Sequence, residues 1–160
     1  MQIQEKLGMK NIGAFDLKAA CSGFIYGLSV ADQFIRNRSH NTILLIGAEV
    51  QSVALVYDND HRDMAVLFGD GAGAFVLEKS NEPGWGILSS NIQSDGQFSD
   101  ILFTNGGPGT NRKVGTVEMN GKEVFKHAVE KLADSLHKAV SDSKIKITDI
   151  DYIVPHQANE

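Results

Sequence analysis

The chain has 160 residues, 42% of them hydrophobic and 22% charged, and its 15 basic and 20 acidic side chains give a formal net charge of −5. This composition is close to the average for a soluble globular domain and excludes collagen-like, disordered and disulfide-rich proteins. The single cysteine, Cys21, cannot form an internal disulfide, which is typical of a reducing compartment. Scattered basic residues argue against a nucleic-acid groove. No apolar run reaches the roughly 18–20 residues of a membrane span, and residues 1–6 lack the apolar core of a signal peptide, so a cytoplasmic location is expected.

The hydrophobic pattern predicts helices and strands in alternation. Residues 2–9 have the pattern of an amphipathic helix, and residues 19–37 carry apolar side chains at helical spacing. The clearest helix follows Asn120, which has capping-box spacing with Glu123. Five short apolar runs have the composition of strands, namely residues 14–17, 42–50, 74–77, 86–93 and 152–154. The run 42–50 is apolar on both faces, which predicts a buried strand. This alternation predicts an α/β layered fold.

The number of helices does not match the number of strands. Two long helices are too few to cover both faces of such a sheet, and the last predicted strand is followed at once by the end of the sequence. The sequence is therefore interpreted as a segment of a larger protein.

Cys21 lies where a predicted strand ends and a helix begins. The amides and the dipole of a helix N-terminus favour an anion, and therefore the nucleophilic thiolate. Small neighbours, among them Ala20 and Ser22, leave the sulfur within reach of a ligand. By position alone, a buried structural cysteine is the commoner interpretation of such a residue.

Two further polar residues are candidates for a site. His156 follows a predicted strand and Pro155, and site residues gather at strand ends in α/β folds. Arg62 lies in a polar loop, where it is either a solvated charge or a bidentate phosphate ligand. The histidines have no metal-ligand spacing with cysteine or carboxylates, so neither a metal nor a cofactor is predicted.

The glycine-rich stretch 69–73 does not fit a dinucleotide site. A dinucleotide fingerprint requires G-x-G-x-x-G at the start of a helix, whereas here G-x-G-x-G is followed by an apolar strand. These glycines are expected to allow a bend and close backbone packing within a sheet. A dinucleotide-binding oxidoreductase is therefore not supported.

Four motifs, in this order, resemble the β-ketoacyl-acyl-carrier-protein synthase III family. They are the nucleophile segment 14–24, the glycine-rich strand 68–74, the helix start 119–126 and the histidine motif 155–159. The resemblance implies a thiolase-like fold, in which two α/β halves form five αβαβα layers. Residues 1–82 would then be the later part of the first half, and residues 83–160 the start of the second.

The resemblance also implies a mechanism. Cys21 would attack the thioester of a short acyl-CoA such as acetyl-CoA, with its own backbone N–H in the oxyanion hole. His156 would donate a hydrogen bond to the thioester carbonyl of malonyl-acyl-carrier protein and stabilise the enolate left by loss of CO₂. The carbanion would attack the acyl-cysteine and yield a β-ketoacyl thioester, the first condensation of fatty acid synthesis, without a metal or cofactor.

Further residues match positions of the family that contact substrate or carrier. Arg62 would contact the nucleotide end of CoA. The pantetheine tunnel would be lined by Gly121, Phe125, Ala158 and Asn159. Lys126 and Gln157 would contact the acyl carrier protein. The implied partners are acyl-CoA, the carrier protein and a second copy of the chain in a homodimer, without nucleic acid or membrane.

The chain also departs from the family pattern. The family's catalytic asparagine and a second oxyanion donor, a glycine amide, belong beyond the histidine motif and are not present here. The 160 residues alone are therefore expected to be a poor catalyst, and no role is assigned to residues 99–117. Two alternatives stay open: another thiolase-fold condensing enzyme (chalcone-synthase-like, quinolone-type or hydroxymethylglutaryl-CoA-synthase-like), and a non-catalytic remnant.

Overall fold

The structure is a computed structural model that describes residues 2–158. Its helices are α1 (Gln2–Lys6), α2 (Gly23–Arg36), α3 (Arg62–Ala65) and α4 (Gly121–Ser143), and its strands are β1 (Thr42–Glu49), β2 (Gly71–Glu78), β3 (Leu102–Thr104) and β4 (Val117–Met119). Short 3-10 turns are η1 (Ala20–Ser22), η2 (Ser52–Ala54), η3 (Gly96–Phe98) and η4 (Ile147–Asp149). Among residues 2–158, none of the helices is both long and apolar enough to cross a membrane.

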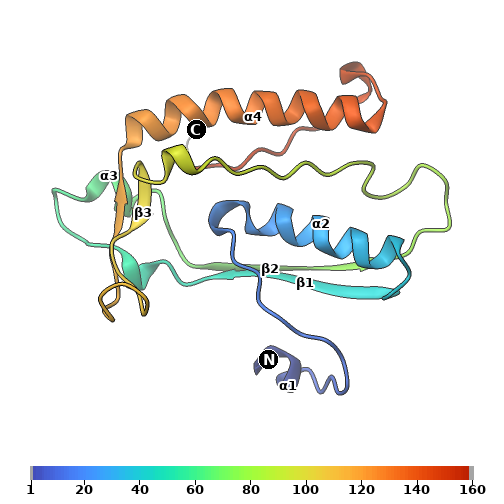
Figure 1. The fold of residues 1–160 in the computed structure, drawn as a ribbon, viewed down its shortest axis with the longest axis horizontal. Helices are drawn as coiled ribbons and strands as arrows, with labels where there is room; N and C mark the ends of the chain where they lie inside the picture. Colours follow the sequence, from blue (N-terminus) through green and yellow to red (C-terminus); the bar gives the residue numbers. More distant parts are fainter. Residues whose placement is uncertain (1, 159–160) are drawn as a thin grey trace.

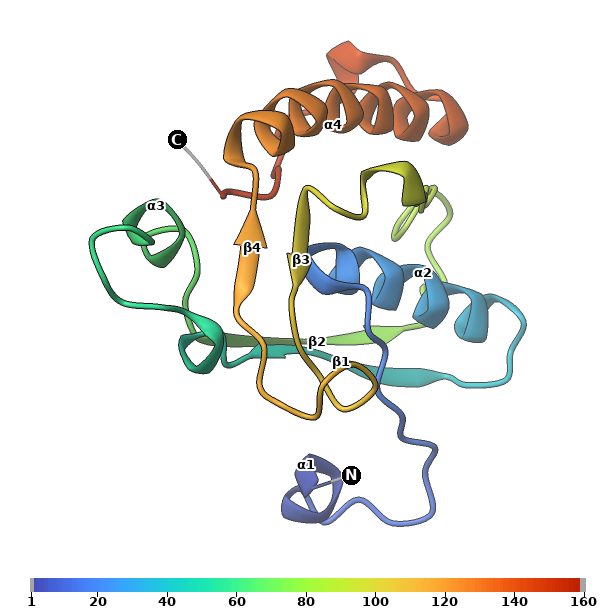
Figure 2. The same cartoon turned by 60° about the vertical axis from the view of Figure 1, so that its left-hand side comes forward.

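The β1–β2 ribbon and the helix on it form the best-packed part of the molecule. The two strands run antiparallel, with Thr42 opposite Glu78 and Glu49 opposite Gly71, so the predicted strands 42–50 and 74–77 are confirmed. α2 lies along one face of the ribbon (Figures 1 and 2). The approach is close at Gly27, where a Cβ would lie 2.6 Å from Cδ1 of Leu45 on β1.

An extended segment, residues 87–93, forms hydrogen bonds to both long helices, α2 and α4. It passes between α2 and α4 (Figure 1). The hydroxyl of Tyr26 on α2 donates to the carbonyl of Gln93 at 3.0 Å, and the hydroxyl of Ser89 donates to the carbonyl of Ala139 on α4 at 2.9 Å. The Tyr26–Gln93 bond crosses the predicted domain border between residues 82 and 83, whereas the Ser89–Ala139 bond lies within the second predicted half. The border itself stays a prediction.

A short hairpin leads into α4. β3 and β4 pair antiparallel, with Leu102 opposite Met119. The side chain of Asn120 then caps the helix by accepting from the backbone N–H of Glu123 at 3.4 Å, as the spacing predicts. The reciprocal bond of a capping box does not form, because the Asn120 N–H already donates to the carbonyl of Ile101 at 2.8 Å.

Three of the predicted strands do not form, because their residues pair with no other strand. Residues 14–17, 86–93 and 152–154 belong to no strand of the described chain. A strand requires a neighbour that completes its backbone hydrogen bonds, and no partner strand lies beside these runs among residues 2–158. The predicted helix 2–9 is also shorter, ending at Lys6 ahead of Gly8, whose φ of +67° is left-handed.

The glycine-rich stretch 69–73 is only partly as predicted. Its later residues begin β2 rather than a helix, which confirms that it is not a dinucleotide loop. The expected close packing is absent, because a Cβ at Gly69, Gly71 or Gly73 would meet nothing within 4 Å. Side chains point out of the faces of a sheet, so no other part of the described chain covers the backbone at these glycines.

The described chain has almost no core. Its buried apolar side chains are Ala31 and Met64, and even β1, predicted to be buried, has half-buried or exposed residues. The accessible surface is 12959 Å², whereas a compact protein of this mass exposes about 7,900 Å². The excess of roughly 5,000 Å² is several times the area of about 800 Å² that each partner buries in a standard interface.

Candidate active site

Cys21 lies in a tight turn at the start of α2. Ala19 has a φ of −142°, Ala20 has a left-handed φ of +46°, and the η1 turn is closed by the Ser22 N–H, which donates to the Ala19 carbonyl at 3.1 Å. The Cys21 thiol is exposed and forms no disulfide. The interpretation of Cys21 as a buried structural cysteine is therefore wrong for the described chain.

The other predicted catalytic residue lies in the last segment of the described chain. His156 follows Pro155 in a stretch without regular structure, and its side chain is exposed, as are those of Gln157 and Ala158. Asn159 lies outside the described residues. The predicted histidine motif is therefore present on the surface, with no strand ahead of it.

The elements that carry the predicted site residues gather on one side of the molecule. The start of α2, the short helix α3, the start of α4 and the C-terminal segment all lie on the side of β3 and β4 in both views (Figures 1 and 2). No hydrogen bond joins the Cys21 and His156 side chains within residues 2–158. The roles assigned to these residues stay predictions.

Arg62 begins α3 directly after an ordered polar turn. The Oδ1 atom of Asp58 accepts from the backbone N–H of Asp60 at 3.0 Å and of His61 at 2.9 Å, and it lies 2.7 Å from Nδ1 of the His61 ring. That hydrogen bond raises the pKa of His61 and lowers the pKa of Asp58, and the charge of Glu118 on β4 raises the pKa of His61 further. The sequence analysis missed this pair, although an Asx turn ahead of a helix is its recognisable signal.

A second carboxylate ties the ends of β1 and β2 together. The two carboxylate oxygens of Asp70 accept from the backbone N–H of Ser52 at 2.8 Å and from its hydroxyl at 2.7 Å. Hydrogen bonds from Ser52, chiefly that of its backbone N–H, lower the pKa of Asp70. Asp70 therefore fixes the η2 turn, a structural role that the glycine-rich motif does not reveal.

The first half of α4 presents predicted substrate-binding residues to solvent. Gly121 is the first residue of the helix and Phe125, one turn later, is 56% exposed. Phe125 continues into an exposed apolar stripe with Val129 and Leu132. Lys126, the predicted carrier contact, is also exposed. The arrangement provides an exposed apolar strip beside a cation.

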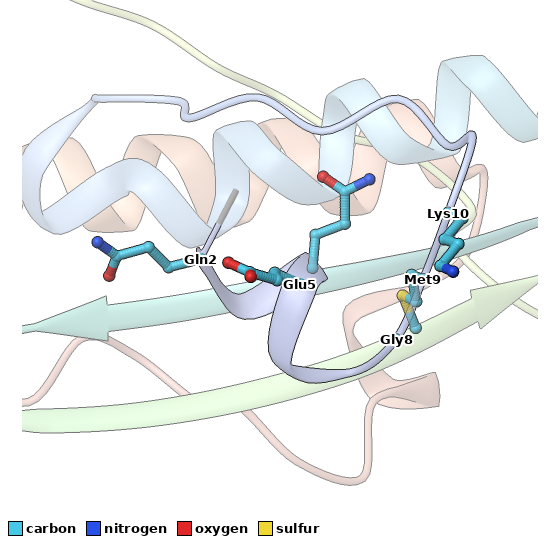
Figure 3. A pocket seen from close by; sticks show the side chains of 6 residues that line it. Gln2, Glu5, Gly8, Met9 and Lys10 are labelled. Carbon is cyan, nitrogen blue, oxygen red and sulfur yellow. The ribbon is translucent and has the colours of Figure 1, made fainter.

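Two hollows lie elsewhere on the described chain and hold none of the predicted site residues. One surrounds α1, away from α4, and Figure 3 shows the side chains of Gln2, Glu5, Met9 and Lys10 around it. The other lies under the second half of α4. Its largest side chains are apolar, namely Leu88, Leu136, Val140, Ile145, Ile150, Tyr152, Ile153 and Val154. Within residues 2–158, no three His, Cys, Asp or Glu side chains are placed to hold a metal ion.

Known proteins resemble the whole described chain. It is 52% identical over 157 residues to the β-ketoacyl-[acyl-carrier-protein] synthase III of Ehrlichia canis, covering 98% of this chain and 49% of that protein. Solved 3-oxoacyl-[acyl-carrier-protein] synthase III structures from Aquifex aeolicus and Pseudomonas aeruginosa superpose with TM-scores of 0.89 and 0.88, at 35% and 34% identity. Each match covers 99% of this chain and 48% of the solved one.

The chain therefore spans about half the length of the curated relatives it matches. Its fold is the corresponding part of a thiolase-like α/β fold, as the motifs predict. The family model for 3-oxoacyl-[acyl-carrier-protein (ACP)] synthase III matches residues 15–96, which is more than half of the 160 residues. The chain belongs to the 3-oxoacyl-[acyl-carrier-protein] synthase III family.

Proposed function

We propose that this chain is the nucleophile-carrying part of a β-ketoacyl-acyl-carrier-protein synthase III. The observation that carries the proposal is the exposed Cys21 thiol on a tight turn at the start of α2, in a chain of this family. The enzyme would transfer a short acyl group from CoA to Cys21 and condense it with malonyl-acyl-carrier protein. A homodimer and a cytoplasmic location belong to the same proposal.

The first step is acyl transfer to Cys21. The sulfur gives up its proton and attacks the carbonyl carbon of acyl-CoA, and the backbone N–H of Cys21 donates to the oxyanion of the tetrahedral intermediate. The bond between that carbon and the CoA sulfur then breaks, and CoA leaves as the thiol with a proton. The exposure of the thiol and the small residues around it support direct access for the thioester.

The second step is decarboxylative condensation. His156 donates a hydrogen bond to the thioester carbonyl of malonyl-acyl-carrier protein, so that the electron pair left by CO₂ is held as an enolate. The enolate carbon attacks the acyl carbonyl carbon, a carbon–carbon bond forms, and the Cys21 thiolate is released. The position of the C-terminal segment on the side where α2 begins supports this role (Figures 1 and 2).

The remaining predicted residues would bind the two thioesters. Arg62, at the start of α3, would pair with phosphate at the nucleotide end of CoA. The pantetheine arm would lie along the first turns of α4 against Gly121 and Phe125, with Ala158 and Asn159 from the histidine motif. Lys126 and Gln157 would contact the carrier protein. The exposed apolar stripe of α4 supports this placement.

The 160 residues would act only together with the remaining half of the fold. The excess exposed surface supports this, because a stable domain does not leave so much apolar area in water. The missing half would also supply the family's asparagine and its second oxyanion donor.

The proposal is tested by condensation assays on the native protein that carries this chain, at its full length. We expect product from acetyl-CoA with malonyl-acyl-carrier protein and at least tenfold less with malonyl-CoA. His156→Ala should lower condensation while leaving acylation of Cys21 within about threefold, and His137→Ala on the outer part of α4 is the matched control. A preference for malonyl-CoA would indicate a polyketide-type enzyme instead. No condensation with either donor would support the non-catalytic remnant.

A further inference from the structure

A row of polar side chains on α2 faces the segment 87–93, which passes between α2 and α4 (Figure 1). The hydroxyl of Tyr26 donates to the carbonyl of Gln93 at 3.0 Å. One turn later, the hydroxyl of Ser29 lies 3.0 Å from the hydroxyl of Ser90. Side chains three residues apart share a face of a helix, so both contacts are on the same side of α2.

The row ends at Arg36, the last residue of α2. Its guanidinium donates to the carbonyl of Ile87, and the carboxylate of Asp32 orients it by accepting from Nε at 2.6 Å. With the first two contacts, this one ties the segment 87–93 to α2 at three successive points, in antiparallel order. The position of the segment along the helix is therefore set by polar contacts.

The opposite side of the same segment contacts α4. The hydroxyl of Ser89 donates to the carbonyl of Ala139 at 2.9 Å and lies 2.7 Å from the hydroxyl of Ser143. Alternate residues of an extended segment point to opposite sides, which is why Ser89 faces α4 whereas its neighbour Ser90 faces α2. The segment is thus bonded to one helix on each side.

The segment 87–93 also lies beside the chain that leads to His156. Leu88 and residues 152–154 line the same hollow under α4. His156 follows these residues after a single proline. On its other side, the segment is bonded to the helix that begins directly after the Cys21 turn. It therefore lies between the parts of the chain that carry the two proposed catalytic residues.

We propose that the Tyr26 hydroxyl is a positioning group, which sets the place of Cys21 relative to the part of the chain that carries His156. Tyr26 is the member of the row nearest to Cys21, five residues on, or about 8 Å along a helix. Condensation joins an acyl group on Cys21 to an enolate held by His156, and a misplacement of about 1 Å can cost about 100-fold in rate. This inference rests on the proposed function, which supplies both roles.

Loss of the hydroxyl should affect the two chemical steps differently. In Tyr26→Phe the ring remains, but the Gln93 carbonyl loses its donor and the start of α2 loses its nearest tie to the segment. Acylation of Cys21 by a small thioester requires only the exposed thiol and the turn around it. Condensation requires Cys21 and His156 to be matched across the segment, so it should be the step that suffers.

The test separates these steps in the native full-length protein. Cys21 is first acetylated with S-acetyl-N-acetylcysteamine, a short thioester without the CoA nucleotide, and the acetyl groups are counted by mass spectrometry. Malonyl-acyl-carrier protein is then added, and condensation is measured per acetylated Cys21. The matched control is Tyr57→Phe, because Tyr57 is 67% exposed and its hydroxyl has no hydrogen-bond partner within residues 2–158.

We expect Tyr26→Phe to acquire its acetyl group within about twofold of the normal rate, whereas condensation per acetyl-enzyme falls at least fivefold. The KM for malonyl-acyl-carrier protein should change less than about twofold, because Phe125 and Lys126, proposed to bind it, lie on α4 beyond the segment. Ser29→Ala, one turn further from Cys21, should lower condensation less than Tyr26→Phe does. Tyr57→Phe should leave both steps unchanged.

Other results would overturn the inference. An equal loss of acetylation and condensation in Tyr26→Phe would show that the hydroxyl supports the Cys21 turn or the whole fold. Unchanged condensation would show that it sets no position. If the unsubstituted protein takes up no acetyl group, the proposed function fails and the positioning role with it. Urea unfolding of Ser29→Ala, Ser90→Ala and the double variant then still reports, through non-additivity, whether α2 and the segment are in contact.

Discussion

The β1–β2 ribbon and the segments 86–93 and 152–154 have similar compositions but different structures. All are short apolar runs, yet only the ribbon is hydrogen-bonded as strands, with eight residues of each strand in register. Each strand of the ribbon has its partner within the described chain, because β1 pairs with β2. The other two segments lack a neighbouring strand there. Composition therefore marks a potential strand, and a partner is needed to make it one.

The same comparison separates the two halves of the candidate site. The Cys21 turn is defined by contacts made within the described chain, including the packing of α2 on the ribbon. The His156 segment has neither a strand ahead of it nor a covering layer. The position of Cys21 is therefore set by contacts within the described chain, whereas His156 has no such support there.

The largest expected difference between the ribbon and the unpaired segments is in the rate of backbone hydrogen exchange. In the isolated 160-residue chain, backbone amides of β1 and β2 should exchange much more slowly than those of residues 86–93 and 152–154, which have no partner strand. In the native full-length protein, both unpaired segments should become as protected as the ribbon. Peptide-resolved mass spectrometry measures both. Equal protection of all four segments in the isolated chain would contradict the comparison.

Substitution at Gly27 should test the packing of α2 on the β1–β2 ribbon. Gly27→Val places side-chain atoms against Leu45, where a Cβ alone would already lie 2.6 Å from Cδ1. We expect a loss of about 2 kcal/mol in the free energy of unfolding, because extra atoms in a filled space force rearrangement. Urea unfolding of the full-length protein measures it.

A matched pair of variants provides the control for that prediction. Gly23, on the same helix, has nothing within 4 Å of a Cβ. Gly23→Ala should therefore be neutral or stabilising through helix propensity. Combining Gly27→Val with Leu45→Ala should cost less than the two changes added separately, because the smaller residue opens the space. Strict additivity would show that Gly27 and Leu45 do not interact.

A smaller effect is expected at the turn before Arg62, whose order should depend on pH. Both shifts follow from the Asp58–His61 hydrogen bond, which raises the pKa of His61 and lowers the pKa of Asp58. The order of this turn should be complete between those two values. It should be lost as pH rises through the raised pKa of His61, and again as pH falls through the lowered pKa of Asp58.

The charged groups that face His61 are Asp58, Asp60 and Glu118. An NMR titration of the His61 ring measures its pKa directly. Asp58→Asn should move that pKa down towards the ordinary histidine value, because the main charge partner is removed while the amide oxygen still accepts the backbone N–H groups. An unchanged His61 pKa in Asp58→Asn would show that the pair does not interact in solution.

Local pattern was sufficient to predict α2, α4 and both strands of the ribbon. Helical spacing of apolar residues predicted α2, and Asn120 with Glu123 located the start of α4. These features depend on residues close in sequence, so the information lies within each element. Strand pairing depends on residues far apart in the sequence, and this is why runs 86–93 and 152–154 were wrongly predicted to be strands.

The chemistry of the site was predictable only in part. Roles for Cys21, His156 and Arg62 were predicted from their positions and from motif order, and these roles stay predictions. The left-handed φ of Ala20 was not, because alanine carries no signal for that conformation. The bond between Asp70 and Ser52 joins residues 18 positions apart through a turn, and no sequence pattern predicts it. The Asp58–His61 pair had a signal, a turn-forming aspartate before a helix, that was overlooked.

The most direct test of the account is the location of the acyl group. The native full-length protein is incubated with acetyl-CoA alone, digested with a protease, and its peptides are examined by mass spectrometry. We predict one acetyl group on the peptide that contains Cys21, sensitive to hydroxylamine as a thioester is, and none on that peptide in Cys21→Ser. An unmodified Cys21 peptide, or an acetyl group on another residue, would contradict the assignment of Cys21 as the nucleophile.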